Sequence, residues 1–424
     1  MLEPIGKHIR LLDERNGSAS NPPLLGVSIE KVFMPSVANT IGSNMANYKV
    51  VRRGQFACSL MQVRRDKKMP VALLRDHEEA IVSPAYPVFE IIDENQLLPE
   101  YLMMWMLRPE FDREACFYAV GGVRGGLEWD DLCSMQLPVP SIEKQREIVK
   151  EYQTVVDRIR LNERLNEKLE EAAQAIYKQW FVDFEFPMTA EYAESIGKPE
   201  LAGQPYKSSG GEMEYNEVLE QEIPKGWRVL PLSEVTITVI DHRGKTPTKL
   251  GGVWSESGYP AISAKNIKAN RIVQRHTIRF VDDDLYRAWM KIPLAADDVL
   301  MTSEAPLGQL YLITRNTSYL LSQRLFGIRP DQQVQSGAFL LNWLMSDFVK
   351  AEFDGRGTGT TVTGIRQSEL VQIPVLTPPF GVLSCFQKLV LPLYQHVHIR
   401  EQEAHRLEDC AEIFLCTLAS RDAA

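Results

Sequence analysis

Apolar side chains recur with a seven-residue period over residues 141–182. One core row is Tyr152, Ile159, Asn166, Ala173 and Trp180, and the other is Ile148, Val155, Asn162, Leu169 and Ile176. Alternating steps of three and four residues place both rows on one face of an α-helix. The pattern predicts a coiled-coil helix that begins at Ser141, a residue type that caps helix starts, with two asparagines in mid-seam.

A second heptad pattern occupies residues 377–424. Its rows are Phe386, Leu393, Arg400, Leu407 and Phe414, and Val390, Val397, Ala404, Ala411 and Leu418. Pro392 predicts a kink or a helix start, because proline lacks the N–H that a helix interior needs. Because polar residues interrupt both seams, we expect the helices to pack antiparallel with these polar middles opposite each other, which sets register. In the alternative, each helix packs on its own domain and the asparagines face water.

The remaining residues predict two mixed domains and a connection between them. Residues 1–140 carry strand-like runs bounded by glycine and proline, and helical spacing from Leu98 to Leu107. Residues 227–376 resemble them in organisation. Residues 183–226 hold Gly/Pro/Ser-rich stretches that predict an extended or flexible linker. These elements together predict an α+β protein.

The two halves of the chain repeat each other. Leu137-Pro138-Val139 corresponds to Ile373-Pro374-Val375 at an offset of 236 residues, and each precedes a heptad pattern. Trp105 and Trp343 correspond at nearly the same offset. A unit of this size is a domain followed by a helix. The duplication favours a protein that reads two copies of something.

Composition limits the class of protein. The 424 residues are 44% hydrophobic and 24% charged, which is ordinary for folded domains, and no apolar run is long enough for a membrane span. The six cysteines are scattered, which favours reduced thiols in a cytoplasmic protein. The formal net charge is −9, yet residues 52–75 carry seven Lys/Arg against Asp66 alone, and residues 242–279 carry eight against Glu256 alone. Local patches of this kind decide phosphate binding.

Both domains also contain glycine-rich turns late in their sequence, at residues 121–126 and 357–364. Small residues let backbone amides approach phosphates, while Arg and Lys supply counter-charge. The basic runs and turns give the candidate DNA-binding residues: Arg64, Arg65, Lys67, Lys68, Arg124, Arg243, Lys245, Lys265, Lys268, Thr360, Thr361 and Arg366. The open alternative for each basic run is a solvated loop.

Other motifs give no catalytic site. Asn21-Pro22-Pro23-Leu24 lacks the aromatic residue that would stack on a flipped adenine, and no glycine-rich turn for a methyl donor accompanies it. Gly244-Lys245-Thr246 lacks the leading glycine of a nucleotide-binding loop. The seven histidines show no metal-ligand grouping. We therefore expect a non-enzymatic chain without a bound metal or cofactor.

The pattern resembles the specificity subunit of type I restriction–modification systems. The resemblance rests on the duplication and on local phrases: Leu137-Pro138-Val139-Pro140-Ser141, Ile176-Tyr177-Lys178-Gln179-Trp180-Phe181, and Ile223-Pro224-Lys225-Gly226-Trp227. It spans essentially the whole chain. The segment Pro378-Pro379-Phe380-Gly381 departs from it, because it lacks the Gln/Arg-rich entry of the first helix.

The resemblance implies two target-recognition domains in pseudo-twofold arrangement, separated by two long antiparallel coiled-coil helices. Each domain would read one half of a bipartite, asymmetric target in double-stranded DNA. The helices would space the halves and dock two modification subunits, which carry S-adenosylmethionine, and motor/nuclease subunits using ATP and Mg²⁺ would join them. A helix of about 33 residues is roughly 50 Å long, enough to span half-sites one DNA turn apart.

Two other classes of function compete with this one. A chain that methylates or cleaves DNA by itself would need a cofactor motif, and a pure scaffold would make no DNA contact. Transfer of a methyl group by the chain alone would favour the first. Unchanged DNA binding after removal of the basic runs would favour the second.

Overall fold

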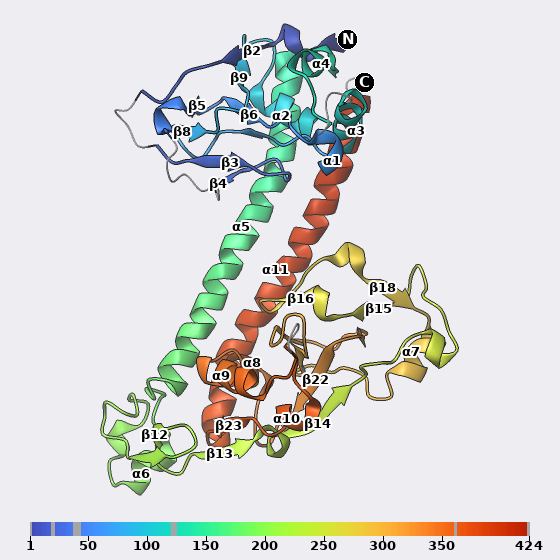
Figure 1. Cartoon of the computed structure of the whole chain (residues 1–424). Helices are drawn as coiled ribbons and strands as arrows, with labels where there is room; N and C mark the ends of the chain where they lie inside the picture. Colours follow the sequence, from blue (N-terminus) through green and yellow to red (C-terminus); the bar gives the residue numbers. More distant parts are fainter. Residues whose placement is uncertain (1, 18–21, 37–43, 120–124, 360–362, 422–424) are drawn as a thin grey trace. The chain divides into compact units, whose positions relative to one another are not determined.

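The structure, a computed structural model, describes residues 2–17, 22–36, 44–119, 125–359 and 363–421. Its internal contacts divide the chain into two units, residues 1–161 with 403–424 and residues 162–402. Each unit holds one mixed domain and a part of each of two long helices (Figure 1).

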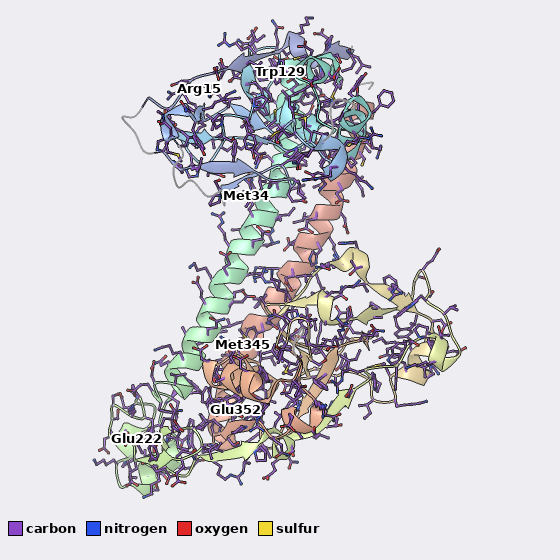
Figure 2. All side chains as sticks on the ribbon, in the orientation of Figure 1. Arg15, Met34, Trp129, Glu222, Met345 and Glu352 are labelled. Carbon is purple, nitrogen blue, oxygen red and sulfur yellow. The ribbon has the colours of Figure 1, made fainter. Side chains whose placement is uncertain are left out.

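The first domain is built on an antiparallel sheet of order β2-β9-β6-β7, formed by Ile9–Leu12, Val88–Ile91, Phe56–Cys58 and Val71–Leu73. Two smaller sheets pair β3 (Leu25–Val27) with β4 (Phe33–Pro35), and β5 (Lys49–Arg52) with β8 (Glu79–Val82). Helices α2 (Pro99–Leu107), α3 (Pro109–Tyr118) and α4 (Trp129–Ser134) follow. Proline suits the first position of α2 and α3, since no N–H is needed there. The ring of Trp129, labelled in Figure 2, lies 5.5 Å from that of Phe89 and packs α4 on the sheet.

The second domain has an antiparallel sheet of order β14-β22-β19-β20, formed by Thr236–Asp241, Leu325–Pro330, Val299–Thr302 and Leu310–Leu312. Strand β15 (Tyr259–Ile262) lies between β18 (Arg279–Val281) and β21 (Leu320–Leu321), and β16 (Ile267–Lys268) pairs with β17 (Arg271–Ile272). The helices are α7 (Asp283–Trp289), α8 (Gly337–Leu344), α9 (Asp347–Arg356) and α10 (Gln367–Leu370). Ser336 and Ser346 cap α8 and α9, each accepting a backbone N–H at 3.3 Å.

The repeat seen in the sequence is a repeat of topology. The two four-stranded sheets have equivalent strand orders, and each is followed by a helix pair, α2–α3 or α8–α9. In both domains the first strand pairs antiparallel with the last, β1 (Leu2–Pro4) with β10 (Gln136–Pro138) and β13 (Arg228–Pro231) with β23 (Pro374–Thr377). The Leu/Ile-Pro-Val motifs that first indicated the repeat form these last strands.

In both domains the central sheet separates two hydrophobic clusters. On β19, Val299 and Met301 join the cluster that includes residues of the long helices, whereas Leu300 joins the other. On β6, Phe56 and Ala57 divide between two clusters in the same way. Successive side chains of a strand point to opposite faces, which explains the alternation. We call the cluster around Ile262, Val281, Trp289 and Leu320, with the elements that carry it, the outer lobe of the second domain.

The long helices are α5 (Ile142–Phe181) and α11 (Phe380–Arg421), of 40 and 42 residues. Ser141 caps α5 by accepting the N–H of Lys144 at 3.3 Å. Within the first unit Tyr152 faces Phe414 and Arg158 pairs with Glu403. Residue numbers therefore rise along α5 in the direction in which they fall along α11. Within the second unit Tyr177 and Trp180 contact Phe386, at the opposite end of α11. The two helices are therefore antiparallel, and the predicted α+β class is confirmed.

The predicted rows face the interior of this pair. Of the predicted core residues, Asn162, Asn166 and Val397 are buried, and the others are half-buried: Tyr152, Ile159, Leu169, Ile176, Leu393, Arg400, Leu407 and Phe414. Asn162 is 0% exposed and Asn166 is 2% exposed, so the alternative in which they face water is excluded.

Arg400 is half-buried, and its guanidinium donates to the carbonyl oxygen of His396 one turn earlier on α11. Arg271 of the second domain also contacts the helix pair, where it pairs with Glu170 of α5. Heptad spacing could not reveal this residue, because it comes from a strand distant in sequence.

Pro392 does not start the helix, as α11 runs through it from Phe380. One missing hydrogen bond is tolerated because Val390 and Tyr394, on either side of it, are buried in the core of the unit.

The segment 183–226 is not an extended or flexible linker. It contains α6 (Ala190–Ser195) and a hairpin of β11 (Met213–Asn216) and β12 (Gln221–Pro224). The ring of Phe186 stacks on Tyr206 at 4.6 Å and contacts Trp227 at 4.9 Å. Gly211 is required here, since a Cβ at this position would lie 2.4 Å from the Tyr206 ring. Glycine content predicts flexibility only where no aromatic residues bury the backbone.

Candidate nucleic-acid interface

The residue directly after the late glycine-rich turn of each domain bonds to the segment that follows an inner strand of the sheet. In the first domain the N–H of Leu127 donates to the carbonyl oxygen of Leu60, after β6, at 2.9 Å. In the second domain the N–H of Ile365 donates to the carbonyl oxygen of Ser303, after β19, also at 2.9 Å. The duplication therefore repeats this backbone contact after the corresponding inner strand of each sheet.

The basic run of the first domain contains a short helix, α1 (Val63–Asp66). Gln62 and Lys67 at its ends have left-handed φ angles of 67° and 55°, which turn the chain sharply on both sides. The backbone N–H of Arg64 donates to the carbonyl oxygen of Gly125 at 3.1 Å, so α1 lies against the glycine-rich turn.

The four candidate cations of this run, Arg64, Arg65, Lys67 and Lys68, differ in how far they are already paired. Arg65 forms an ion pair with Asp66 at 2.7 Å, and Lys68 with Glu30 at 3.1 Å. Arg64 and Lys67 are exposed, and no ion-pair partner is found for either among the described residues. We call Arg64 and Lys67 the first basic surface, because these charges are available to an external anion.

Arg243 and Lys245 of the second domain are used internally. The Arg243 guanidinium bonds to both carboxylate oxygens of Asp241 at 2.7–3.0 Å and lies 4.3 Å above the Phe326 ring. Burial raises the pKa of Asp241, but its bonds from Arg243 outweigh this and the pKa ends below its ordinary value. Lys245 donates to the carbonyl oxygen of Trp289 at 2.9 Å, and burial lowers its pKa. Their first role is therefore to hold the domain together.

A polar hollow of about 340 Å³ lies on the outer lobe of the second domain. Lys265, Arg279 and Arg324 line it together with Trp254. The Arg279 guanidinium lies 4.1 Å above the Trp254 ring, and Arg324 pairs with Glu304 at 3.0 Å. Lys265 is exposed and has no ion-pair partner in the described ranges. We call Lys265, Arg279 and Arg324 the second basic surface.

The other candidates are dispersed. Lys268 is exposed on β16, and Arg366 is exposed at the residue before α10. Arg124, Thr360 and Thr361 lie outside the described residues. The candidates of the second domain are thus not one cluster: Lys265 lies in the hollow, whereas Arg243 and Lys245 serve the core.

Sequence reasoning missed three residues of the hollow: Trp254, Arg279 and Arg324. Trp254 and Arg279 lie inside the basic run 242–279, and an aromatic residue within a basic run is a usable signal for a stacking cation. Arg324 gave no signal, because it joins the hollow from a turn between β21 and β22 far along the chain.

The surface chemistry suits a polyanion better than a small substrate. Free Arg and Lys side chains contact phosphate oxygens, and Arg also reads guanine edges. In the parts of the chain that the structure describes, no group of three or more histidine, cysteine, aspartate or glutamate residues is arranged to hold a metal ion. No helix in those parts is long and apolar enough to cross a bilayer.

Comparisons with known proteins agree with this geometry. Residues 71–171 match the family described as the type I restriction modification DNA specificity domain. The chain is 24% identical over 406 residues to the type I restriction enzyme HindI specificity subunit of Haemophilus influenzae, covering 87% of this chain and 86% of that protein. It is 22% identical to the MjaIX specificity subunit of Methanocaldococcus jannaschii over 72% of this chain and 65% of that one.

One solved structure also shares the fold. The crystal structure of a type I restriction–modification S subunit from M. genitalium superimposes with a TM-score of 0.58 at 12% identity, covering 98% of this chain and 94% of that one. The family match, the curated relatives and this shared fold together confirm the resemblance found in the sequence.

Proposed function

We propose that this chain, a member of the family of type I restriction–modification specificity subunits, reads a bipartite DNA target with its two mixed domains. The observation that carries the proposal is the repeated topology with unlike basic surfaces. Arg64 and Lys67 follow strand β6 in one domain, and in the other Arg324 of the second basic surface pairs with Glu304, which follows the equivalent strand β19. A repeated scaffold with different cations fits two half-sites of different sequence.

The paired helices then serve as a spacer and as a platform for partners. A helix of 40 residues is about 60 Å long. Two half-sites one DNA turn apart require roughly 34 Å. A packed helix pair fixes such a distance better than a flexible connection does. The modification subunits, and the methyl donor, ATP and Mg²⁺ that they and the motor subunits use, belong to other chains in this proposal.

The test is DNA binding by the complex assembled with its modification subunits. Arg64→Ala/Lys67→Ala and Lys265→Ala/Arg279→Ala/Arg324→Ala each remove one basic surface. We expect each variant to bind DNA more weakly. The slope of log K against log salt concentration should become less negative by about 0.9 for each phosphate that the variant no longer neutralises. Methylated adenines mapped in a host that carries the wild-type complex would give the target itself.

Two exposed arginines provide matched controls. Arg113 and Arg287 have side chains 70% and 76% exposed and form ion pairs within their own helices. Alanine at either position should leave the salt dependence unchanged. Wild-type affinity in both surface variants would contradict DNA reading by these surfaces and favour a scaffold without DNA contact.

A further inference from the structure

The hairpin β16–β17 projects a single arginine from the outer lobe. Its two central residues, Ala269 and Asn270, have φ angles of 47° and 58°, as in the tight turn that matches the twist of paired strands. Asn270 is fixed further, because its side-chain oxygen accepts the N–H of Leu312 at 2.9 Å. This rigid turn sets the position of the next residue, Arg271.

Arg271 lies between two carboxylates from different helices. Its terminal nitrogen is 3.0 Å from Glu170 of α5, and its Nε is 3.7 Å from Glu401 of α11. The three side chains are only 28%, 23% and 13% exposed. Among the described residues that pair with Glu170 or Glu401, Arg271 is the one that meets both helices.

Burial limits what the cluster can add to stability. Burial raises the pKa of Glu401 to about 7 in spite of the nearby guanidinium. One oxygen of Glu170 is buried without a hydrogen-bond partner among the described residues. Partly buried ion pairs of this kind add little net stability, but they permit few alternative arrangements.

The outer lobe has other contacts with α11. The ring of Tyr311 stacks on His398 at 4.8 Å, Thr314 bonds to the Nδ1 of His398 at 3.0 Å, and Arg315 bonds to Gln402 at 2.6 Å. All three involve α11 alone. Arg271 adds a contact with α5, so the outer lobe is held by both long helices.

We propose that Arg271 is a positioning residue that holds the outer lobe, and with it the second basic surface, in one register on the helix pair and so restricts the spacer length of the DNA target. The proposal rests on the proposed function. Neighbouring spacer lengths differ by one base-pair rise, about 3.4 Å along the duplex. A lobe free to move by that distance would accept several spacers, whereas a guanidinium held between two carboxylates is fixed more closely.

The experiment measures methylation by the assembled complex on DNA targets whose spacers are native, one base pair shorter and one longer. With Arg271→Met, we expect the preference for the native spacer to fall at least about fivefold, within the range of pairwise coupling energies. The half-site sequences should stay the same. Arg271→Lys, which can reach one carboxylate but not hold both in a fork, should be intermediate.

One further variant, a double substitution, and one control complete the test. Glu170→Gln/Glu401→Gln keeps side-chain volume and removes both carboxylates, so it should relax spacer choice even if Arg271→Met fails to assemble. Arg287→Met on α7 of the same lobe is the matched control and should keep wild-type selectivity. Unchanged spacer selectivity in both the Arg271→Met and the double glutamine complexes would overturn the positioning role alone. Absence of any bipartite methylated target with the wild-type complex would overturn the proposed function as well.

Discussion

At the scale of single residues, burial controls which side chains of the second unit carry charge. Glu401 has its pKa raised to about 7 by burial, which Arg271 only partly offsets. His398 has its pKa lowered to about 4, chiefly by burial. Their effects on stability are opposite: the histidine contribution is lost as pH falls from 6.5 to 4, and the glutamate contribution is lost as pH rises from 4.5 to 7.

Replacement of Glu401 isolates the second of these effects. Between pH 4.5 and 7 the folded protein binds more protons at Glu401 than the unfolded chain does, so ionisation costs stability as pH rises. We expect Glu401→Gln to gain stability relative to wild type by up to about 3 kcal/mol between pH 4.5 and 8. Urea denaturation of both proteins at a series of pH values measures the difference. Glu412→Gln, at an exposed position on the same helix, is the control, and a difference that does not grow with pH would contradict the assignment.

Sequence reasoning located the basic runs but not the function of each cation within them. Composition made Arg243 and Lys245 candidates for DNA binding. In the structure Arg243 pairs with Asp241 and lies on the Phe326 ring, and Lys245 bonds to the backbone of Trp289. Those partners come from other strands and helices, and their approach depends on the tertiary fold. Arg64 and Lys67 kept their predicted availability because α1 and its sharp ends hold them at the surface.

At the scale of elements, the heptad rows predicted α5 closely, and helix α2 was predicted after Pro99 as observed. Periodicity succeeds in such cases because one face of the helix is buried over many turns. For residues 183–226 the prediction rested on glycine and proline content alone, which does not show whether the backbone is buried, and it was wrong. The aromatic residues Phe186, Tyr206 and Trp227 bury that segment although glycines surround them.

Asn162 offers a test of how the helix pair balances stability against register. Both polar atoms of its side chain are buried and have no hydrogen-bond partner among the described residues. Asn162→Leu should therefore stabilise the protein by about 1–3 kcal/mol, since a buried unpaired amide is costly. The midpoint of urea denaturation measures the change. Lys168→Leu, 74% exposed on α5, should change stability by less than about 0.5 kcal/mol, and a destabilised Asn162→Leu would show that the amide has a partner after all.

At the scale of the whole molecule, the repeat is the feature that the sequence revealed most fully. Short motifs a fixed distance apart were enough to predict two equivalent domains, and both have the same order of sheet strands and the same helix pair. What they could not predict is the outer lobe, where the two domains differ most in strand content. The repeated parts build the core and the strand pairs that close each domain. The divergent parts carry the surfaces proposed to read DNA.

Lengthening both helices tests whether they set the distance between half-sites. Seven residues inserted after Leu161 in α5 and seven after Gln402 in α11 preserve the heptad rows and add about 10 Å. We expect the preferred spacer to lengthen by about three base pairs, and methylation to be weaker than native because DNA also turns by roughly 100° over that length. Sequencing of methylated targets measures the spacer. An unchanged spacer with intact half-sites would contradict the role of the helices.

The pairing of the first and last strands of each domain has a consequence for how such chains diversify. Because β1 lies against β10, and β13 against β23, the polypeptide enters and leaves each domain at neighbouring residues. Everything between those strands is one continuous stretch of the gene. A single crossover at each end can therefore exchange one complete domain for another as a cassette. The two long helices, which lie outside those strand pairs, stay unchanged by such an exchange.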